Sequence, residues 1–270
     1  MAAVAIPQVG WCTTDLRSAR NAGFDYAECG IRNVAALPDE MFEQFANHHA
    51  SLQVPTPVGN VLLPPQLKVV GNEIDSLAEE RYVRKALSRA QRLGVQLIVF
   101  GSARSRTVPE GFSRERAFAQ LVQFGIRLSR LAADSDMTVA LEPVGRPEGN
   151  IVVDSREAAQ LVAAVAQPNF KLMIDLYHWH QAGETVESLR AVASDIKHIH
   201  VAHPVNRQFP QEDDAYDYRP FFETLRAIGY RGRTSIEGAV PRDLGRVAPR
   251  SIAFLRSLAG ERAGTSATPS

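Results

Sequence analysis

Four short stretches of this chain end in residues that can bind a metal ion or transfer a proton. The stretches are 138–142 (TVALE), 171–175 (KLMID), 196–200 (IKHIH) and 233–237 (RTSIE). Apolar side chains alternate along each of them as in a β-strand, so the final residue lies on the face opposite the bulky residues. These final residues are Glu142, Asp175, His200 and Glu237. Three carboxylates and one imidazole suit a single divalent cation, with Mn²⁺ favoured and Mg²⁺ or Co²⁺ acceptable.

Such a set of residues favours proton transfer next to a carbonyl group. A cation chelated by a carbonyl oxygen and the neighbouring hydroxyl oxygen acidifies the C–H between them, because it stabilises the enediolate. With one carboxylate on each face of the substrate, one can remove the proton and the other can return it. Return to the opposite face of the same carbon is epimerisation. Return to the adjacent carbon is aldose–ketose isomerisation.

The elements that must bring these residues together alternate along the whole chain. Strands are expected over residues 3–9, 25–28, 52–58, 95–100, 138–142, 170–175, 196–202 and 233–237. Helices are expected after a cap at Asp15, over 38–49, 74–93 and 113–133, after a cap at Ser155, and over 185–193, 218–228 and 247–258. Eight strand–helix units without a domain break predict an α/β fold, the (β/α)8 TIM barrel, whose strand ends converge on one mouth.

The size of the chain agrees with that fold. It has 270 residues, 45% of them hydrophobic, which is enough for one large core. We expect a single barrel domain over residues 1–259 and a flexible tail over 260–270, which is small and polar. The alternative is a doubly wound sheet, but the segment after the first strand (VGWCTTD) is not a glycine-rich phosphate turn.

Charge and cysteine usage narrow the function classes. Lys and Arg total 30 and balance 30 Asp and Glu, which argues against a nucleic-acid binder driven by overall charge. Cys12 and Cys29 have no metal-binding spacing, and residues 1–10 do not read as a signal peptide. No apolar run is long enough to span a membrane. We expect a cytoplasmic protein that binds neither membranes nor nucleic acid and forms a homo-oligomer, a dimer or a tetramer.

Several motifs together resemble the xylose-isomerase-like barrels. The motifs are Glu142-Pro143 with Arg146 and Glu148, Asp175-x-x-His178, His198-x-His200, Arg207, and Ser235-Ile236-Glu237. The resemblance spans nearly the whole chain, including residues 23–28 (GFDYAE). It is strongest to the ketose 3-epimerases and hydroxypyruvate-isomerase-like enzymes, a group often labelled sugar phosphate isomerase/epimerase.

That resemblance implies a role for each matching residue. Glu142, Asp175, His200 and Glu237 would be the metal ligands, and Glu142 and Glu237 would also be the acid/base pair. His178, Arg207 and Glu148 would contact substrate oxygens. The implied activity is a divalent-metal-dependent isomerase or epimerase of a ketose or related keto-sugar, acting through an enediolate. His203 and Gly145 depart from the residues that many relatives carry there, which indicates a different substrate.

Two other activities remain open on the same barrel. A dehydratase or lyase acting on a keto-sugar or keto-glycoside would use the same two carboxylates, with the acid protonating a leaving group. A DNA-repair endonuclease would use three metals and extra histidines, and the third strand region 54–57 (VPTP) supplies none. The arginines that could support it also read as a solvated helix start or a phosphate contact; they are Arg104, Arg106, Arg114 and Arg116.

A few more polar residues fall at the expected mouth of the barrel. Glu28, at the end of the second strand, could support a metal ligand or only make a hydrogen bond at the top of the barrel. Trp11, Asn60 and Ser102 lie on mouth loops and could shape the pocket. His198 is expected to line the core rather than to bind the metal.

Overall fold

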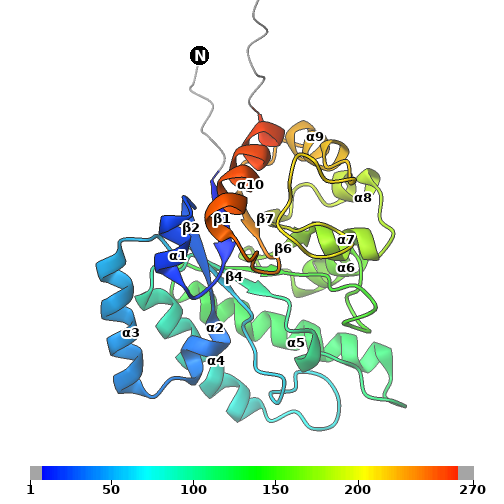
Figure 1. The fold of residues 1–270 in the computed structure, drawn as a ribbon. Helices are drawn as coiled ribbons and strands as arrows, with labels where there is room; N and C mark the ends of the chain where they lie inside the picture. Colours follow the sequence, from blue (N-terminus) through cyan, green and yellow to red (C-terminus); the bar gives the residue numbers. More distant parts are fainter. Residues whose placement is uncertain (1–7, 261–270) are drawn as a thin grey trace, which may run out of the picture.

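Eight parallel strands, each hydrogen-bonded to the next and the last to the first, close into a barrel (Figure 1). The computed structural model describes residues 8–260. The strands are β1 (Val9–Cys12), β2 (Tyr26–Gly30), β3 (Val58–Asn60), β4 (Leu97–Phe100), β5 (Thr138–Leu141), β6 (Phe170–Asp175), β7 (Ile196–Val201) and β8 (Arg233–Ile236). The predicted (β/α)8 barrel is confirmed.

Helices surround the barrel and connect successive strands. They are α1 (Leu16–Asn21), α2 (Ile31–Ala36), α3 (Asp39–Leu52), α4 (Ser76–Arg92), the short 3₁₀ helix η1 (Ala103–Ser105), α5 (Arg114–Ala133), α6 (Ser155–Val165), α7 (Leu176–Gln181), α8 (Val186–Ala191), α9 (Arg219–Ala227) and α10 (Leu244–Ala259). Asp15 caps α1 as predicted, because its side chain accepts a hydrogen bond from the backbone N–H of Ser18. The cap of α6 is Asp154 rather than the neighbouring Ser155. No helix in residues 8–260 is both long and apolar enough to cross a membrane.

Three further local predictions, which concern whole strands and helices, were wrong. The first strand was predicted over residues 3–9 but occupies Val9–Cys12, and residues 3–7 lie outside the described part of the chain. The third strand was predicted over 52–58 but is only Val58–Asn60, because α3 runs on to Leu52 and two prolines follow. Helices α2 and α7 were not predicted, since six residues are too few to show a helical repeat. The predicted tail, apart from Gly260, lies outside the described residues.

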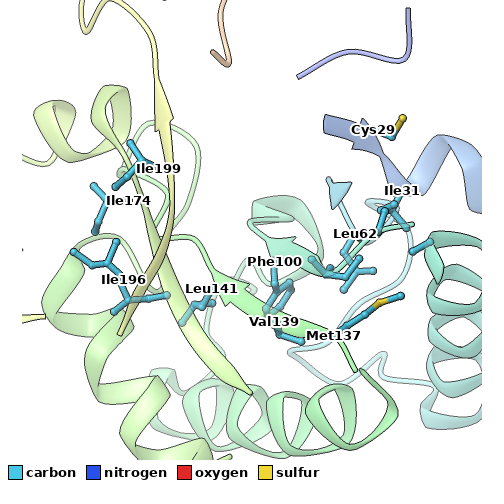
Figure 2. Packing of buried hydrophobic residues seen from close by; sticks show 14 of the residues in the cluster. Cys29, Ile31, Leu62, Phe100, Met137, Val139, Leu141, Ile174, Ile196 and Ile199 are labelled. Carbon is cyan, nitrogen blue, oxygen red and sulfur yellow. The ribbon is translucent and has the colours of Figure 1, made fainter. Parts of the chain in front are cut away.

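The core has two layers, as the alternating pattern requires. Inside the barrel lies a small apolar cluster of Tyr26, Val58, Leu97, Val99, Ala140 and Met173. The opposite faces of the strands pack against the helices in a larger cluster, part of which is shown in Figure 2. Gly10 is needed here, because a Cβ at this position would lie 2.2 Å from the ring of Tyr26. The inward-facing positions that follow this apolar layer project into the mouth.

Candidate metal centre and active site

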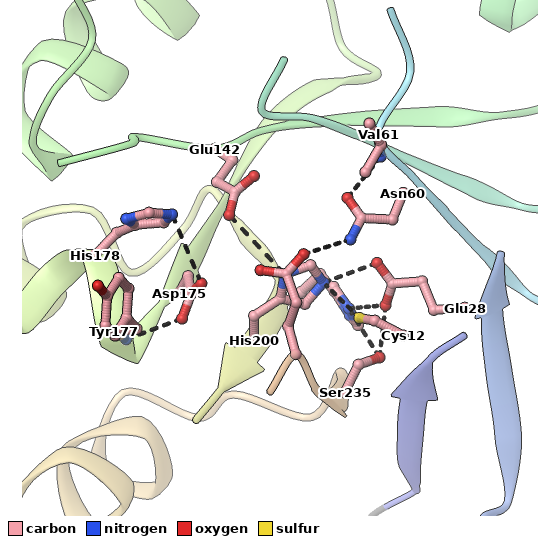
Figure 3. A network of polar contacts seen from close by, with 12 residues as sticks. Cys12, Glu28, Asn60, Val61, Glu142, Asp175, Tyr177, His178, His200 and Ser235 are labelled. Atoms are coloured by element: carbon pink, nitrogen blue, oxygen red, sulfur yellow. Dashed lines mark hydrogen bonds and ion pairs between the residues drawn. The ribbon is translucent and has the colours of Figure 1, made fainter. Parts of the chain in front are cut away.

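The four predicted metal-binding residues meet at the mouth of the barrel. Asp175 ends β6 and pairs in register with His200 of β7, whereas Glu142 and Glu237 directly follow β5 and β8. One ligand atom from each of the four lies within 4.8 Å of the others. The Nδ1 atom of His200 lies 3.9 Å from Oε1 of Glu142 and 3.7 Å from Oε2 of Glu237 (Figure 3).

Two atoms of this group lack the partners that buried polar atoms normally have. Oδ2 of Asp175 and Nδ1 of His200 are buried and accept no hydrogen bond from any residue in 8–260. Burial, together with the nearby carboxylate of Glu237, raises the pKa of Glu142 to about 8 and that of Asp175 to about 7. A divalent cation bound here would offset the repulsion between the carboxylates and would give both unpartnered atoms a ligand contact. The donor set therefore fits a hard or borderline metal ion.

The two glutamates of the predicted acid/base pair have different surroundings. Burial alone would raise the pKa of Glu237, but His200, Arg207 and Asn60 lower it to about 2. Nη2 of Arg207 lies 2.7 Å from Oε2 of Glu237, and Nδ2 of Asn60 donates to Oε1 at 2.7 Å. Glu142 has no comparable contact to a cationic side chain among the described residues. In the metal-free protein, Glu142 therefore binds a proton readily, whereas Glu237 remains ionised.

A second polar cluster lies beneath the first and holds the opposite side of the His200 ring (Figure 3). Oε1 of Glu28 lies 2.7 Å from Nε2 of His200, and Oε2 lies 2.9 Å from Nε2 of His198. Ser235 donates to the same Oε2 at 2.6 Å. The two imidazoles outweigh the effect of burial and lower the pKa of Glu28, so this carboxylate accepts hydrogen bonds from both rings.

This lower cluster fixes which nitrogen His200 offers. Nε2 of His200 contacts Glu28, so Nδ1 is the nitrogen that faces the three carboxylates and could bind a metal ion. Histidines that bind metals commonly use their other nitrogen in this way, which holds the ring in position. His198 is buried and binds Glu28, so it lines the interior as expected.

The residues expected to contact substrate line a pocket of about 430 Å³ together with Glu142 and Glu237. Arg207 lies 3.1 Å from Oε1 of Glu148 and 3.7 Å from Oδ2 of Asp175, and its guanidinium stacks 4.6 Å from the centre of the Tyr177 ring. Burial and Arg207 lower the pKa of His178 to about 4, so its imidazole is neutral near pH 7. The pocket thus places hydrogen-bonding groups around both carboxylates, and the substrate roles of His178, Arg207 and Glu148 stay predictions.

The four arginines considered for nucleic-acid binding do not form one basic patch. Arg106 is only 1% exposed and donates to the backbone carbonyls of Gly101 and Glu142, both at 2.7 Å. Arg114 pairs with Glu157, and Arg116 lies over the ring of Phe112. Only Arg104 lines the pocket. The interpretation of the group as a solvated helix start was wrong for Arg106, and no periodicity in the sequence marks it as buried.

The sequence analysis identified some of the other pocket residues and missed Arg32. Trp11, Asn60 and Ser102 were considered for their position, and Asn60 and Ser102 line the pocket. The prediction was wrong for Trp11, which lies in β1 and packs in the core against Phe24 and Phe209. Arg32 also lines the pocket but was not considered, because the helix that carries it, α2, was not predicted. Its position, four residues after the end of the predicted second strand, is the signal that could have found it.

Sequence comparison finds one matching family model and several relatives that are named as isomerases or epimerases. The family model described as xylose isomerase-like TIM barrel matches residues 16–258. An L-ribulose 3-epimerase of Methylomonas sp. (strain DH-1) is 28% identical over 228 residues, which are 82% of this chain and 76% of the relative. An inosose isomerase of Bacillus licheniformis is 26% identical over 240 residues, 83% of this chain and 82% of the relative. A putative hydroxypyruvate isomerase of Xenopus laevis is 26% identical over 167 residues, and the match spans 57% of this chain and 58% of that protein.

Solved structures share the fold at lower identity. A D-psicose 3-epimerase crystallised in the presence of D-fructose superimposes with a TM-score of 0.82 at 15% identity, covering 94% of this chain and 100% of that one. The IOLI protein with a bound zinc atom superimposes with a TM-score of 0.71 at 20% identity, covering 93% and 96%. The barrel with its predicted arrangement of strands is therefore shared with both proteins.

Proposed function

From the premise that the chain belongs to the xylose isomerase-like TIM barrel family, we propose that it is a divalent-metal-dependent isomerase or epimerase. Its substrate is a ketose or related keto-sugar, and the reaction passes through an enediolate. Relatives named as an L-ribulose 3-epimerase and an inosose isomerase support this reaction class. The observation that carries the proposal is the meeting of Glu142, Asp175, His200 and Glu237, with unpartnered oxygen and nitrogen atoms facing one another.

Glu142 and Glu237 move the proton. When bound, a divalent cation would polarise the substrate carbonyl and so acidify the adjacent C–H. One glutamate takes that proton while the C–H electron pair moves towards the carbonyl, and the other glutamate returns a proton to the opposite face. The glutamate that acts first as the base depends on which epimer is bound, because the proton leaves towards the carboxylate on its own face.

The neighbouring residues hold the substrate and the bases in position. Arg207 and the neutral His178 offer donors beside Asp175 and Glu237, and Glu148 orients Arg207 through their contact at 3.1 Å. Arg106 fixes the backbone at Glu142 from behind. Holding the reacting carbon at a fixed angle to two carboxylates lowers the entropic part of the barrier.

We further propose Mn²⁺ as the preferred ion, with Mg²⁺ or Co²⁺ as substitutes, because three ligands are carboxylates and one is an imidazole. Metal analysis of the purified protein is the direct test. Asp175→Ala and His200→Ala should fold but lose the ion, whereas His48→Ala, an exposed position on α3, should retain it. Full metal occupancy in both site variants would remove the basis of this assignment.

Solvent-deuterium exchange tests the reaction. A panel of ketoses and keto-acids is incubated with the metal-loaded enzyme in deuterated water, and we expect deuterium at the carbon next to the carbonyl. An isomerase can shuttle the proton without losing it, so partial incorporation agrees with the proposal. Elimination by a dehydratase or lyase would instead release water or another leaving group. Absence of deuterium from both substrate and product over many turnovers would contradict an enediolate.

The cytoplasmic location and the homo-oligomer expected from the sequence stay predictions. Gel filtration combined with light scattering would decide the oligomeric state.

A further inference from the structure

One wall of the pocket carries two arginines whose charges are not neutralised by the protein. Arg32 lies in α2, next to the end of β2, and Arg104 lies in η1, directly after β4. Both line the pocket that also contains Glu142 and Glu237. Within residues 8–260, no carboxylate oxygen lies within 4.0 Å of either guanidinium. Two positive charges are therefore available to a molecule in the pocket.

The other arginines around the site behave differently. Arg207, on the opposite wall, contacts Glu237, Glu148 and Asp175. Arg106 is buried, and two backbone carbonyls accept its hydrogen bonds. The charge of Arg207 is thus shared among three carboxylates, which leaves Arg32 and Arg104 as the free cationic groups of the described pocket lining.

The wall that carries these arginines has a strained but well-fixed backbone. Val61 and Ser102 both line the pocket with positive φ angles, 49° and 35°. Such a conformation is unfavourable for a β-branched residue, and strain of this kind is retained where surrounding contacts impose it, often at ligand sites. Here the side chain of Asn60 accepts from the N–H of Val61 at 2.6 Å (Figure 3). The hydroxyl of Ser102 accepts from the N–H of Leu63 at 3.0 Å.

Two further hydrogen bonds hold the backbone of the two arginines on this wall. The backbone N–H of Arg32 donates to the carbonyl of Val61 at 2.9 Å, so α2 is tied to the strained loop. The ammonium group of Lys68 donates to the carbonyl of Arg104 at 3.0 Å. Each arginine therefore extends from a backbone that is held on the pocket wall, although its guanidinium is free to meet a ligand.

We propose that Arg32 and Arg104 form an anion subsite, and that the physiological substrate is a keto-sugar derivative with an anionic group at the end remote from the reacting carbonyl. The group is a phosphate ester or a carboxylate, whose oxygens match the fork of a guanidinium. This inference rests on the proposed function, because the reacting end is assigned to Glu142 and Glu237. A pocket of about 430 Å³ admits a small sugar derivative with its two ends on different walls. A neutral ketose would leave both arginine charges without a partner.

The test compares matched substrates on matched variants. The substrates are a neutral ketose, the same ketose with a terminal phosphate, and the corresponding keto-acid with a terminal carboxylate. The variants are Arg32→Gln, Arg104→Gln and the double variant. Arg81→Gln, which removes the same charge from an exposed position of α4 outside the pocket, is the control.

We expect each single substitution to lower kcat/KM for the anionic substrate about tenfold, mainly through KM, since a lost charge-assisted contact costs roughly this factor. The double variant should lose more, while kcat/KM for the neutral ketose and metal content stay at the wild-type level. Whether the phosphate or the carboxylate substrate shows the larger loss identifies the natural group. Equal losses on neutral and anionic substrates, or none on either, would overturn the inference.

A binding measurement separates failure of the subsite from failure of the proposed function. Calorimetry with inorganic phosphate and with acetate on the metal-loaded protein should show weaker binding to the double variant than to wild type and Arg81→Gln. If no substrate exchanges deuterium but this difference remains, the subsite stands and the reaction class is wrong. If the wild type and the double variant bind both anions equally, the subsite is wrong whatever the enzyme catalyses.

Discussion

Two buried clusters at the mouth share one histidine and differ in how completely their carboxylate oxygens are paired with hydrogen-bond donors. The mouth cluster consists of Glu142, Asp175 and Glu237 around Nδ1 of His200, and the floor cluster consists of Glu28, His198 and Ser235 around Nε2 of His200. In the floor cluster, both oxygens of Glu28 have donors at 2.6–2.9 Å, although Nδ1 of His198 has no hydrogen-bond partner among residues 8–260. In the mouth cluster, Oδ2 of Asp175 and Nδ1 of His200 lack hydrogen-bond partners among residues 8–260.

The pKa values of two glutamates express the same contrast. Glu28 and Glu142 are both buried, and burial by itself raises the pKa of each. Two imidazoles nevertheless lower the pKa of Glu28, whereas the nearby carboxylate of Glu237 raises that of Glu142 further, to about 8. A satisfied cluster of buried charges supports structure, and an unsatisfied one is suited to receive a ligand with the missing charge.

The largest loss of activity should follow substitutions in the mouth cluster. Glu142→Gln or Glu237→Gln removes both a metal ligand and a proton carrier, so kcat should fall about a thousandfold or more. Steady-state kinetics on any exchanged substrate would measure this loss, with Glu223→Gln, an exposed residue of α9, as the control. Near-normal turnover in either variant would mean that the two-base scheme is wrong.

Substitutions of Glu28 and Ser235 in the floor cluster should alter metal affinity, although neither residue is a proposed metal ligand. Glu28→Gln keeps the size of the side chain but removes the charge that orients His200, so metal affinity should fall about 10–100-fold. Competition with a chelator measures this affinity independently of activity. Ser235→Ala removes only a neutral donor to Glu28 and should change affinity less. If both variants bind the ion like wild type, Glu28 has no role in positioning His200.

The raised pKa of Glu142 should make its contribution to the stability of the metal-free protein fall as pH rises. The pKa of Glu142 rises from 4.5 to about 8 on folding, so the folded state binds the proton more tightly than the unfolded chain between these values. The contribution of this group to the unfolding free energy therefore falls as pH rises through that window. Denaturant unfolding at several pH values should show a weaker fall in Glu142→Gln than in wild type. An identical pH dependence in the two proteins would count against the raised pKa.

Saturating Mn²⁺ provides a second readout of the same effect. Because the ion binds deprotonated carboxylates, it should stabilise wild type more strongly at pH 8 than at pH 5.5. A stabilisation that is equal at both pH values would contradict coupling between the metal and the carboxyl protons.

The smallest effect is expected at the edge of the floor cluster. The hydroxyl of Tyr26 lies 2.8 Å from Oγ of Ser235, and Tyr26→Phe removes only this contact. The unfolding free energy should fall by about 1 kcal/mol, the usual net value of such a hydrogen bond. Metal affinity and kcat should remain those of wild type. A large loss of metal would show that the floor cluster depends on the whole hydrogen-bonded chain rather than on the charge of Glu28.

The sequence by itself determined the barrel and the membership of the mouth cluster. Strand–helix alternation indicates parallel strands whose carboxyl ends meet, and the two-residue repeat of a strand decides which side chains face inward. Glu142, Asp175, His200 and Glu237 satisfy both conditions, so they could be placed together although almost 100 residues separate the first from the last. These are local patterns combined with one rule of topology.

Only the tertiary structure decided the partners of the individual atoms. That Glu28 binds two histidines of β7, that Arg106 lies buried behind Glu142, and that Arg32 faces the pocket depend on strand register and loop conformation. The same holds for β3, which begins later than predicted because α3 is longer. Contacts between distant segments leave no periodic signal in the chain, since each is fixed by the packing of many residues at once. The difference between the fully paired carboxylate of Glu28 and the open mouth cluster therefore emerges only when the barrel closes.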